Sequence, residues 1–301
     1  MAPHSRDLSL AFADHRTTTP DSRRHRRRAA VVVAALAASL LVAAPVAAGK
    51  GPVSARKASP QSDNLKGTRR ADVIDARAGN DKVSAYGGND VVKGQIGNDT
   101  LYGGPGADLI LLHAGDDLGF GGPDDDQILG AAGNDQLFGE DGNDRLVGMP
   151  GDDLLDGSLG DDALQGMPGN DTVLGGDGND HVAGAPGDDW VDAGPGNDEV
   201  DGGDGNDVLI DGAGDDQFTG DAGADILFVG PGVDEVYGEE DDDVIYLLND
   251  GFRDDLYCQG GNDTLVFVGS VDPLDVIHHA VPAGPCEIVT VQAAPPPNWP
   301  Y

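Results

Sequence analysis

Hydrophobic and polar positions along this chain follow a nine-residue unit that recurs twenty times without interruption. Six turn-forming residues precede three residues that suit a strand, as in GGDGNDHVA (175–183) and GGDGNDVLI (202–210). The eighth residue is aliphatic or Phe in 19 of 20 units, and Gly119 is the one lapse. Since the middle side chain of a three-residue strand points to the opposite face from its neighbours, this residue is expected to face inward. The pattern therefore predicts a turn and a short strand in every unit.

An aspartate at the sixth position marks the register of every unit. These residues, which we call the lattice aspartates, fall at every ninth position from Asp72 to Asp243. Glycine stands two residues before them in 17 of 20 units, and the exceptions are Arg70, Asp124 and Asp241. Glycine, together with Asn or Asp next to the lattice aspartate, tolerates the positive φ angles of a tight turn. The three exceptional turns lack the glycine that favours this conformation.

Two units are needed to close a coil, because a closed coil takes two turns and two strands. The coil is then 18 residues long, and stacked coils place their strands in two parallel sheets that lie face to face, with a ladder of turns along each edge. Twenty units predict an all-β fold, a parallel β-roll (β-helix solenoid) of about ten 18-residue coils with a C-terminal β cap.

This geometry stacks aspartates that are 18 residues apart along one edge. Two unit charges about 4.8 Å apart repel by about 1 kcal/mol in water and by about 3.5 kcal/mol at an effective dielectric constant near 20. Summed over two ladders, the repulsion opposes folding. A divalent cation between successive turns reverses the sign of this interaction, and a site of carboxylates and main-chain carbonyls favours a hard ion with flexible coordination. Calcium fits this description best.

The unit resembles the glycine-rich nonapeptide of RTX (haemolysin-type) calcium-binding repeats, GGxGxDxUx. The resemblance covers Gly67 to Tyr246 in register and continues, after a two-residue shift, at Asp254 and Asp263. It implies a β-roll that binds several calcium ions through the lattice carboxylates and the turn carbonyls of adjacent coils. The metal ligands expected on this basis are Asp81, Asp90, Asp99, Asp108, Asp117, Asp126, Asp135, Asp144, Asp153, Asp162, Asp171, Asp180, Asp189, Asp198, Asp207, Asp216, Asp225 and Asp234. The alternative, a disordered acidic tract, does not explain the aliphatic row.

The first 48 residues have the organisation of a signal peptide. Five arginines between Arg23 and Arg28 precede an apolar run from Ala29 to Ala48, which ends in small residues before Gly49. We therefore expect a protein that is secreted by the general export route and is extracellular. A retained membrane anchor is the alternative, since a helix of about 20 apolar residues spans a bilayer.

The negative net charge of the chain limits the kinds of molecule that it can bind. The formal net charge is −36, and removal of residues 1–48 leaves 11 basic and 51 acidic residues, a net charge of −40. Nucleic acids and anionic membrane surfaces would be repelled by such a protein. We expect calcium ions as partners, no nucleic acid, and no membrane after signal cleavage. An extracellular surface or protein is the further partner expected.

Segments outside the registered units (67–246) differ in composition. Residues 49–66 are rich in Ser, Pro and basic residues and are expected to form a flexible linker. Shifted terminal repeats are expected at 247–269, and a cap with a Pro-rich tail at 270–301, because a sheet end needs covering. Cys258 and Cys286 predict a disulfide in an exported chain, with two free thiols as the alternative.

Catalytic motifs are missing from the sequence. There is no HExxH motif and no GxSxG motif, and paired acids such as Asp116 and Asp117 recur with the repeat as turn residues. We therefore expect a protein that is not an enzyme. It would be a secreted calcium-binding repeat protein whose β-roll folds on binding calcium, and a structural, adhesive or interaction module. The alternative is an accessory calcium-binding module of a secreted RTX-type hydrolase, or a reduced relative of one.

Overall fold

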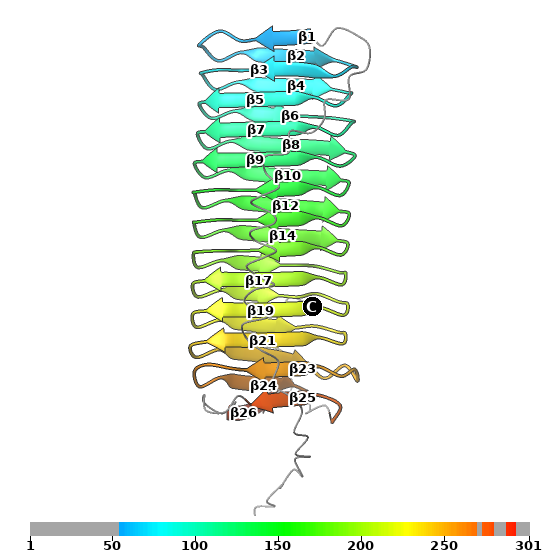
Figure 1. Cartoon of the computed structure of the whole chain (residues 1–301), viewed down its shortest axis with the longest axis vertical. Coiled ribbons are helices and arrows are strands. Elements are labelled where there is room, and N and C mark those ends of the chain that lie inside the picture. Colours follow the sequence, from blue (N-terminus) through cyan, green and yellow to red (C-terminus); the bar gives the residue numbers. More distant parts are fainter. Residues whose placement is uncertain (1–53, 270–272, 280–286, 293–301) are drawn as a thin grey trace, which may run out of the picture. The chain divides into compact units, whose positions relative to one another are not determined.

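A computed structural model describes residues 54–269, 273–279 and 287–292 of the chain. These residues form strands and turns, with no helix among them. Strands alternate along the chain between two parallel sheets of 13 strands each, so that odd-numbered strands form one sheet and even-numbered strands the other. In Figure 1 the strands stack one above another with turns along both edges. The predicted all-β parallel roll is confirmed.

The strands are short, and their bounds repeat with the nine-residue unit. The first sheet contains β1 (Ser54–Lys57), β3 (Asp72–Asp75), β5 (Val91–Ile96), β7 (Leu109–Ala114), β9 (Gln127–Ala132), β11 (Arg145–Val147), β13 (Ala163–Gln165), β15 (His181–Ala183), β17 (Glu199–Asp204), β19 (Gln217–Ala222), β21 (Glu235–Glu240), β23 (Asp255–Cys258) and β25 (Val276–His279). The second contains β2 (Asn64–Thr68), β4 (Lys82–Tyr86), β6 (Thr100–Tyr102), β8 (Leu118–Pro123), β10 (Gln136–Asp141), β12 (Leu154–Leu159), β14 (Thr172–Asp177), β16 (Trp190–Asp192), β18 (Val208–Ile210), β20 (Ile226–Val229), β22 (Val244–Leu248), β24 (Thr264–Val268) and β26 (Glu287–Gln292).

Strand pairing follows the predicted 18-residue coil over most of the roll. Leu137 of β10 pairs with Leu155 of β12, which pairs with Val173 of β14. Toward the C-terminus the coil lengthens, because Glu235 of β21 pairs with Asp255 of β23, and the β24–β26 pairing contains a register shift. The change at β23 is the two-residue shift seen in the sequence.

The roll is longer than about ten coils, since each sheet has 13 strands. Strand β1 and most of β2 lie within residues 49–66, the segment expected to be a flexible linker. Strands β25 and β26 extend the two sheets in parallel, and the described residues contain no separate cap element. The predicted signal segment 1–48 and the tail from residue 293 lie outside the described residues. No helix in the described part of the chain is long and apolar enough to cross a membrane.

The core is a narrow row of aliphatic side chains, each two residues after a lattice aspartate. Leu137 and Leu155 in this row have no exposed surface, as the inward position predicted. Gly119 is the one residue of this row that has no side chain. A Cβ atom on Gly119 would lie 3.0 Å from Cγ2 of Ile128 and 3.3 Å from Cδ1 of Leu112. Leu112 and Ile128 therefore fill the space that Gly119 leaves.

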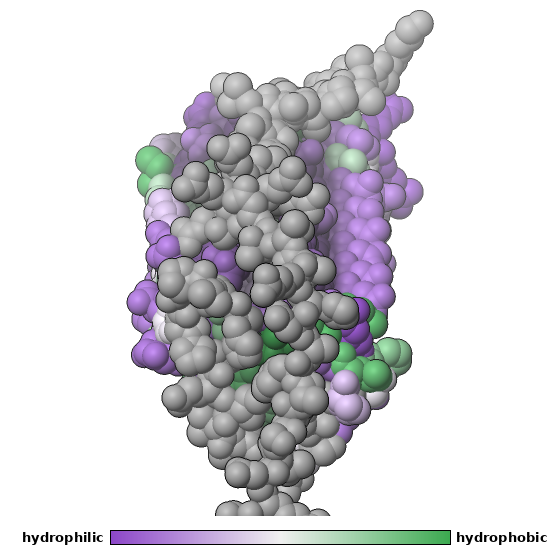
Figure 2. All heavy atoms as spheres, turned by 60° about the horizontal axis from the view of Figure 1, so that its bottom comes forward, coloured by the Kyte–Doolittle hydropathy of each residue, from purple (hydrophilic) through white to green (hydrophobic). Residues whose placement is uncertain are grey.

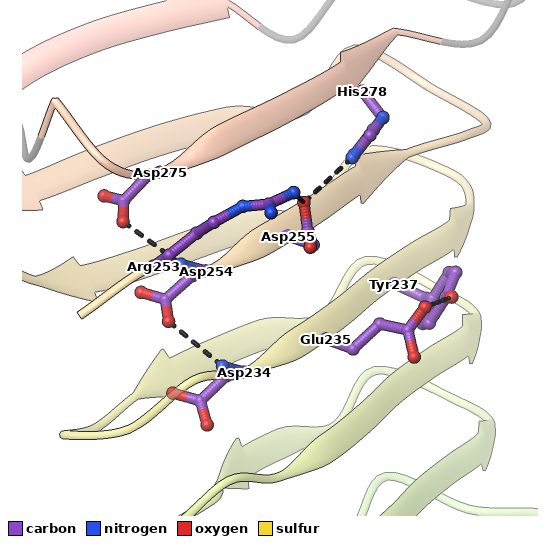
Figure 3. Close-up of polar contacts among 8 residues, drawn as sticks. All are labelled: Asp234, Glu235, Tyr237, Arg253, Asp254, Asp255, Asp275 and His278. Atoms are coloured by element: carbon purple, nitrogen blue, oxygen red, sulfur yellow. Dashed lines mark hydrogen bonds and ion pairs between the residues drawn. The ribbon is translucent and has the colours of Figure 1, made fainter. Parts of the chain in front are cut away.

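The C-terminal coils carry the remaining side chains that the sequence singled out. Cys258 is buried and is part of a disulfide. Cys286, the partner expected from the sequence, lies outside the described residues. The ring of His278 stacks on Tyr257 at a centroid distance of 4.2 Å, and its Nε2 lies 3.1 Å from Oδ1 of Asp255 (Figure 3). These contacts give His278 a packing role.

Most turns contain two residues with positive φ. Gly160, two residues before its lattice aspartate, has φ 136°, and Ser158, four residues before it, has φ 75°. Where the glycine is replaced by Asp124 or Asp241, φ is still 84° or 75°. Aspartate adopts this conformation more readily than most residues do, because its short polar side chain can bond locally. The backbone path is therefore kept at these two exceptional turns.

Replacing Gly160 by Ala should destabilise the roll. A Cβ atom there would lie 1.8 Å from the carbonyl oxygen of Gly142 in the adjacent coil, and φ is 136°. Positive φ alone costs a residue with a Cβ atom about 1–2 kcal/mol, so we expect a total loss of more than about 2 kcal/mol in urea unfolding with saturating calcium. The matched control is Gly87→Ala, where the nearest atom would be 3.5 Å away; its effect should stay within about 0.5 kcal/mol. Equal losses in the two variants would contradict this packing.

Candidate metal centre

Each lattice aspartate lies where a turn leads into the following strand. All 18 expected ligands are buried there, with exposed fractions of 1–3%. Because consecutive units alternate between the two edges of the roll, these aspartates form one row along each edge. Aspartate is seldom buried unless it is paired or binds a metal. Two rows of buried carboxylates therefore require a compensating interaction.

One oxygen of each of the 18 expected ligands is held by the backbone of the preceding coil. The main-chain N–H of Asp144 donates to Oδ1 of Asp162 at 2.6 Å, and the N–H of Asp162 donates to Oδ1 of Asp180 at 2.8 Å. The same bond recurs at 18-residue spacing through both rows, and we call it the inner ladder. Near the C-terminal end, the N–H of Asp234 donates to Oδ1 of Asp254 at 3.1 Å (Figure 3).

The second oxygen has no hydrogen-bond partner, and in most units it faces a glycine. In all 18 expected ligands, Oδ2 is buried and makes no hydrogen bond. Oδ2 of Asp126 lies 2.4 Å from the place that a Cβ atom of Gly121 would take, and the carbonyl oxygen of Gly139 lies 2.8 Å from the same point. A carboxylate oxygen and a carbonyl oxygen of the next coil thus converge at the glycine five residues before the lattice aspartate. Such oxygens are the ligands that calcium prefers, and a buried oxygen without a partner is costly. The residues fit a hard divalent cation.

A second ladder runs along the exposed side of the turns. It consists of the Asn or Asp residue that stands just before most of the lattice aspartates. The N–H of Asn170 donates to Oδ1 of Asp152 at 3.0 Å, and the N–H of Asp188 donates to Oδ1 of Asn170 at 3.2 Å. In this outer ladder a side chain accepts from the following coil, the reverse of the inner ladder. Exposed polar turns of this kind agree with the hydrophilic stripe on the flank of the roll in Figure 2.

Burial dominates the electrostatics of the lattice. Burial raises the pKa of Asp126 from its ordinary value of 3.8 to about 8, the N–H of Asp108 lowers it, and the charges of Asp108 and Asp144 raise it. Burial is also the main reason why the pKa of Asp162 is raised to about 7 and that of Asp180 to about 6. Without a cation, many lattice carboxyls therefore hold a proton near neutral pH. A bound cation would have to displace those protons.

The inner ladder contains two aspartates that the sequence analysis did not assign to it. The N–H of Asp63 donates to Oδ1 of Asp81 at 2.6 Å, and the N–H of Asp254 donates to Oδ1 of Asp275 at 3.3 Å (Figure 3). Asp63 precedes Asp72 by nine residues, so the period already contained this signal. The unit of Asp63 lacks the turn glycine, and its composition is typical of a linker. For these two reasons it was not recognised as a repeat unit.

The ends of the two rows differ in chemistry. Asp243 and Asp263, which were not among the expected ligands, also have a buried Oδ2 without a hydrogen-bond partner. At the N-terminal end, Oδ2 of Asp72 instead accepts the N–H of Thr68 at 2.6 Å and its hydroxyl at 2.9 Å. A local donor thus satisfies the first carboxylate, whereas the later ones keep an oxygen available to a cation.

Acid should favour the roll when calcium is absent. The folded-state pKa values of about 6 to 8 at Asp180, Asp162 and Asp126 lie above the ordinary 3.8, so the folded chain binds more protons than the unfolded chain in this window. The free energy of unfolding must then fall as the pH rises from about 4 to about 8. Circular dichroism in calcium-free buffer should show more strand at pH 5 than at pH 8. A stronger strand signal at pH 8 would contradict the prediction.

A comparison with family models identifies the repeat. The model of the RTX calcium-binding nonapeptide repeat (4 copies) matches residues 58–92, 84–118, 120–155, 156–191, 174–209, 192–227, 201–236 and 219–250. These matches cover more than half of the chain and most of both aspartate rows. A search of curated proteins found no match. With its repeats, parallel roll and buried aspartate rows, the chain belongs to the family of RTX calcium-binding nonapeptide repeat proteins.

Proposed function

We propose that this is a secreted protein whose β-roll folds as it binds calcium, and that the folded roll serves as a structural, adhesive or interaction module. The observation that carries the proposal is the buried second oxygen of each of the 18 expected ligands, which has no hydrogen-bond partner within the described chain. The repeat family supports calcium as the ion. The proposal assigns no catalysis to the chain.

The energetics of one unit support coupling between folding and binding. Each nine-residue unit buries one large aliphatic side chain, such as Leu155, which contributes about 1.5–3 kcal/mol. Ordering nine residues costs about 9–18 kcal/mol of backbone entropy. Hydrogen bonds of the sheets and ladders offset part of this cost at about 1 kcal/mol each, while buried like charges add to it. Calcium supplies the missing free energy because each ion bridges two turns.

A calcium titration followed by circular dichroism at pH 8 tests this coupling. We expect little strand signal in chelator and a steep rise between sub-millimolar and millimolar calcium, the range of many extracellular modules (about 10⁻⁴ to 10⁻³ M). Magnesium should substitute poorly, since it prefers a small and rigid octahedral shell. A strand signal that is already complete in chelator would refute calcium-dependent folding.

A matched pair of variants separates calcium binding from structural hydrogen bonding in the same titration. Asp162→Asn keeps an oxygen for the N–H of Asp144 but removes a buried charge, so the calcium midpoint should rise by about fivefold, or about 1 kcal/mol. In chelator the same variant should be no less structured than the wild type, because a like charge is gone. Asp177→Asn is the control, since Asp177 is exposed, and its midpoint should not change. A calcium midpoint equal to that of the wild type would contradict a role of Asp162 in calcium binding.

Export is the part of the proposal that rests on sequence alone. The basic segment 23–28 and the apolar segment 29–48 both lie outside the described residues. Cleavage after Ala48 should give an extracellular protein that begins at Gly49, which N-terminal sequencing of culture medium would detect. Recovery of only the full-length chain, in the membrane fraction, would contradict secretion.

A further inference from the structure

One turn of the roll carries an acidic residue where every other turn has a small or apolar one. The position lies five residues before the lattice aspartate. It is Gly, Ala, Leu or Val in each unit from Asp63 to Asp243 except that of Asp216, where it is Asp211. Where this position is glycine, as at Gly121, the second carboxylate oxygen and a carbonyl oxygen of the next coil converge on it. Asp211 therefore places a third carboxylate beside an oxygen-rich junction.

Asp211 lies inside the roll. It follows β18, and its exposed fraction is 0%. In the neighbouring coils the equivalent residues, 18 positions away on either side, are Ala193 and Val229, which are also fully buried. Oδ1 of Asp211 accepts the main-chain N–H of Gly212 at 2.7 Å and that of Gly230 at 2.8 Å. Backbone donors from two coils thus hold this carboxylate in one orientation.

Asp211 forms a compact group with two lattice aspartates of one edge. Asp211, Asp216 and Asp234 each offer one oxygen, and these three oxygens lie within 4.8 Å of one another. Among the described residues this is the one group of three or more His, Cys, Asp or Glu side chains close enough to hold a metal ion. Asp216 and Asp234 are 3% and 2% exposed, and Oδ2 of each has no hydrogen-bond partner. The group therefore contains two buried oxygens available to a ligand.

The spacing of the oxygens suits a calcium ion. Calcium–oxygen distances of about 2.3–2.6 Å place two ligands on opposite sides of the ion at most about 5 Å apart, so three oxygens within 4.8 Å can share one ion. Three buried carboxylates in this space strongly disfavour an empty site in which all three are ionised. Calcium affinity in oxygen sites increases with the number of charged ligands and with the rigidity of the site.

We propose that Asp211, Asp216 and Asp234 form a three-carboxylate calcium site that binds its ion at least about tenfold more tightly than the two-carboxylate junctions of the other coils. This inference rests on the proposed function, because it ranks one site among many. The site fills first when calcium rises and empties last when calcium is withdrawn. It joins β18 to β20 and β19 to β21 at the lowest calcium concentration.

Competition with a chromophoric calcium chelator, at fixed pH and with the whole chain, measures the tightest class of sites. Wild-type protein should retain one ion per chain at a free calcium concentration that empties the others. Asp211→Ala should abolish this tight class but leave the number of ions bound at saturation unchanged. The variant is expected to fold, because alanine occupies the equivalent position at Ala193. Asp204→Ala removes one exposed charge from the same region and should keep the tight class.

Asp211→Asn distinguishes charge from hydrogen bonding. It keeps an oxygen for the N–H groups of Gly212 and Gly230, so the affinity of the tight class should fall between those of wild type and Asp211→Ala. Superimposable isotherms for wild type, Asp211→Asn and Asp211→Ala, with calcium bound by all three, would overturn this site while leaving the proposed function intact. A wild-type chain that binds no calcium would overturn both.

Discussion

The hydrogen bond from the main-chain N–H of one lattice aspartate to the carboxylate of the next, 18 residues later, sets the geometry on which the rest of the roll depends. In the 18 expected ligands it holds one carboxylate oxygen, as in the bond from Asp144 to Asp162, and leaves the other oxygen buried without a hydrogen-bond partner. The same bond also aligns carboxylates of like charge along each edge. The fold therefore creates two rows of buried oxygens that fit a cation, together with a large electrostatic cost.

Glycine has a double role around these carboxylates. A side chain at Gly121 would collide with Oδ2 of Asp126 and with the carbonyl oxygen of Gly139, so the absence of a Cβ atom is what lets the oxygens converge. The same small residues leave little apolar volume between the sheets, and the core is reduced to about one large side chain per unit. The glycines that let the carboxylate and carbonyl oxygens approach each other thus reduce the apolar area that the core can bury. For this reason the carboxylate rows, and not the core, govern folding in our proposal.

Much of this architecture was predictable, because nearly every nine-residue unit contains the aspartate, the turn glycine and the aliphatic residue that set the register of the fold. The period of Asp72 to Asp243 gave the coil length, the two edges and the inward row. The ends were less predictable, since Asp63 and Asp275 enter the inner ladder without the turn glycine that marks the other units. Filling of the gap at Gly119 by Leu112 depends on contact across the interior, which no local pattern encodes. The role of Asp211 likewise becomes visible only when residues 18 apart are placed side by side.

The direction of the inner ladder gives the roll a polarity in assembly. Each lattice carboxylate is oriented by an N–H of the coil before it, and Asp63 and Asp72, at the start, instead take donors four residues earlier in their own turns, Ser59 and Thr68. A chain that folds from its amino end therefore meets, at every step, a finished coil whose main-chain N–H groups act as a template for the carboxylates of the next coil. A segment growing from the other end would have to bury each carboxylate before its donor had arrived. The direction of the inner ladder thus favours elongation from the N-terminus, one coil at a time.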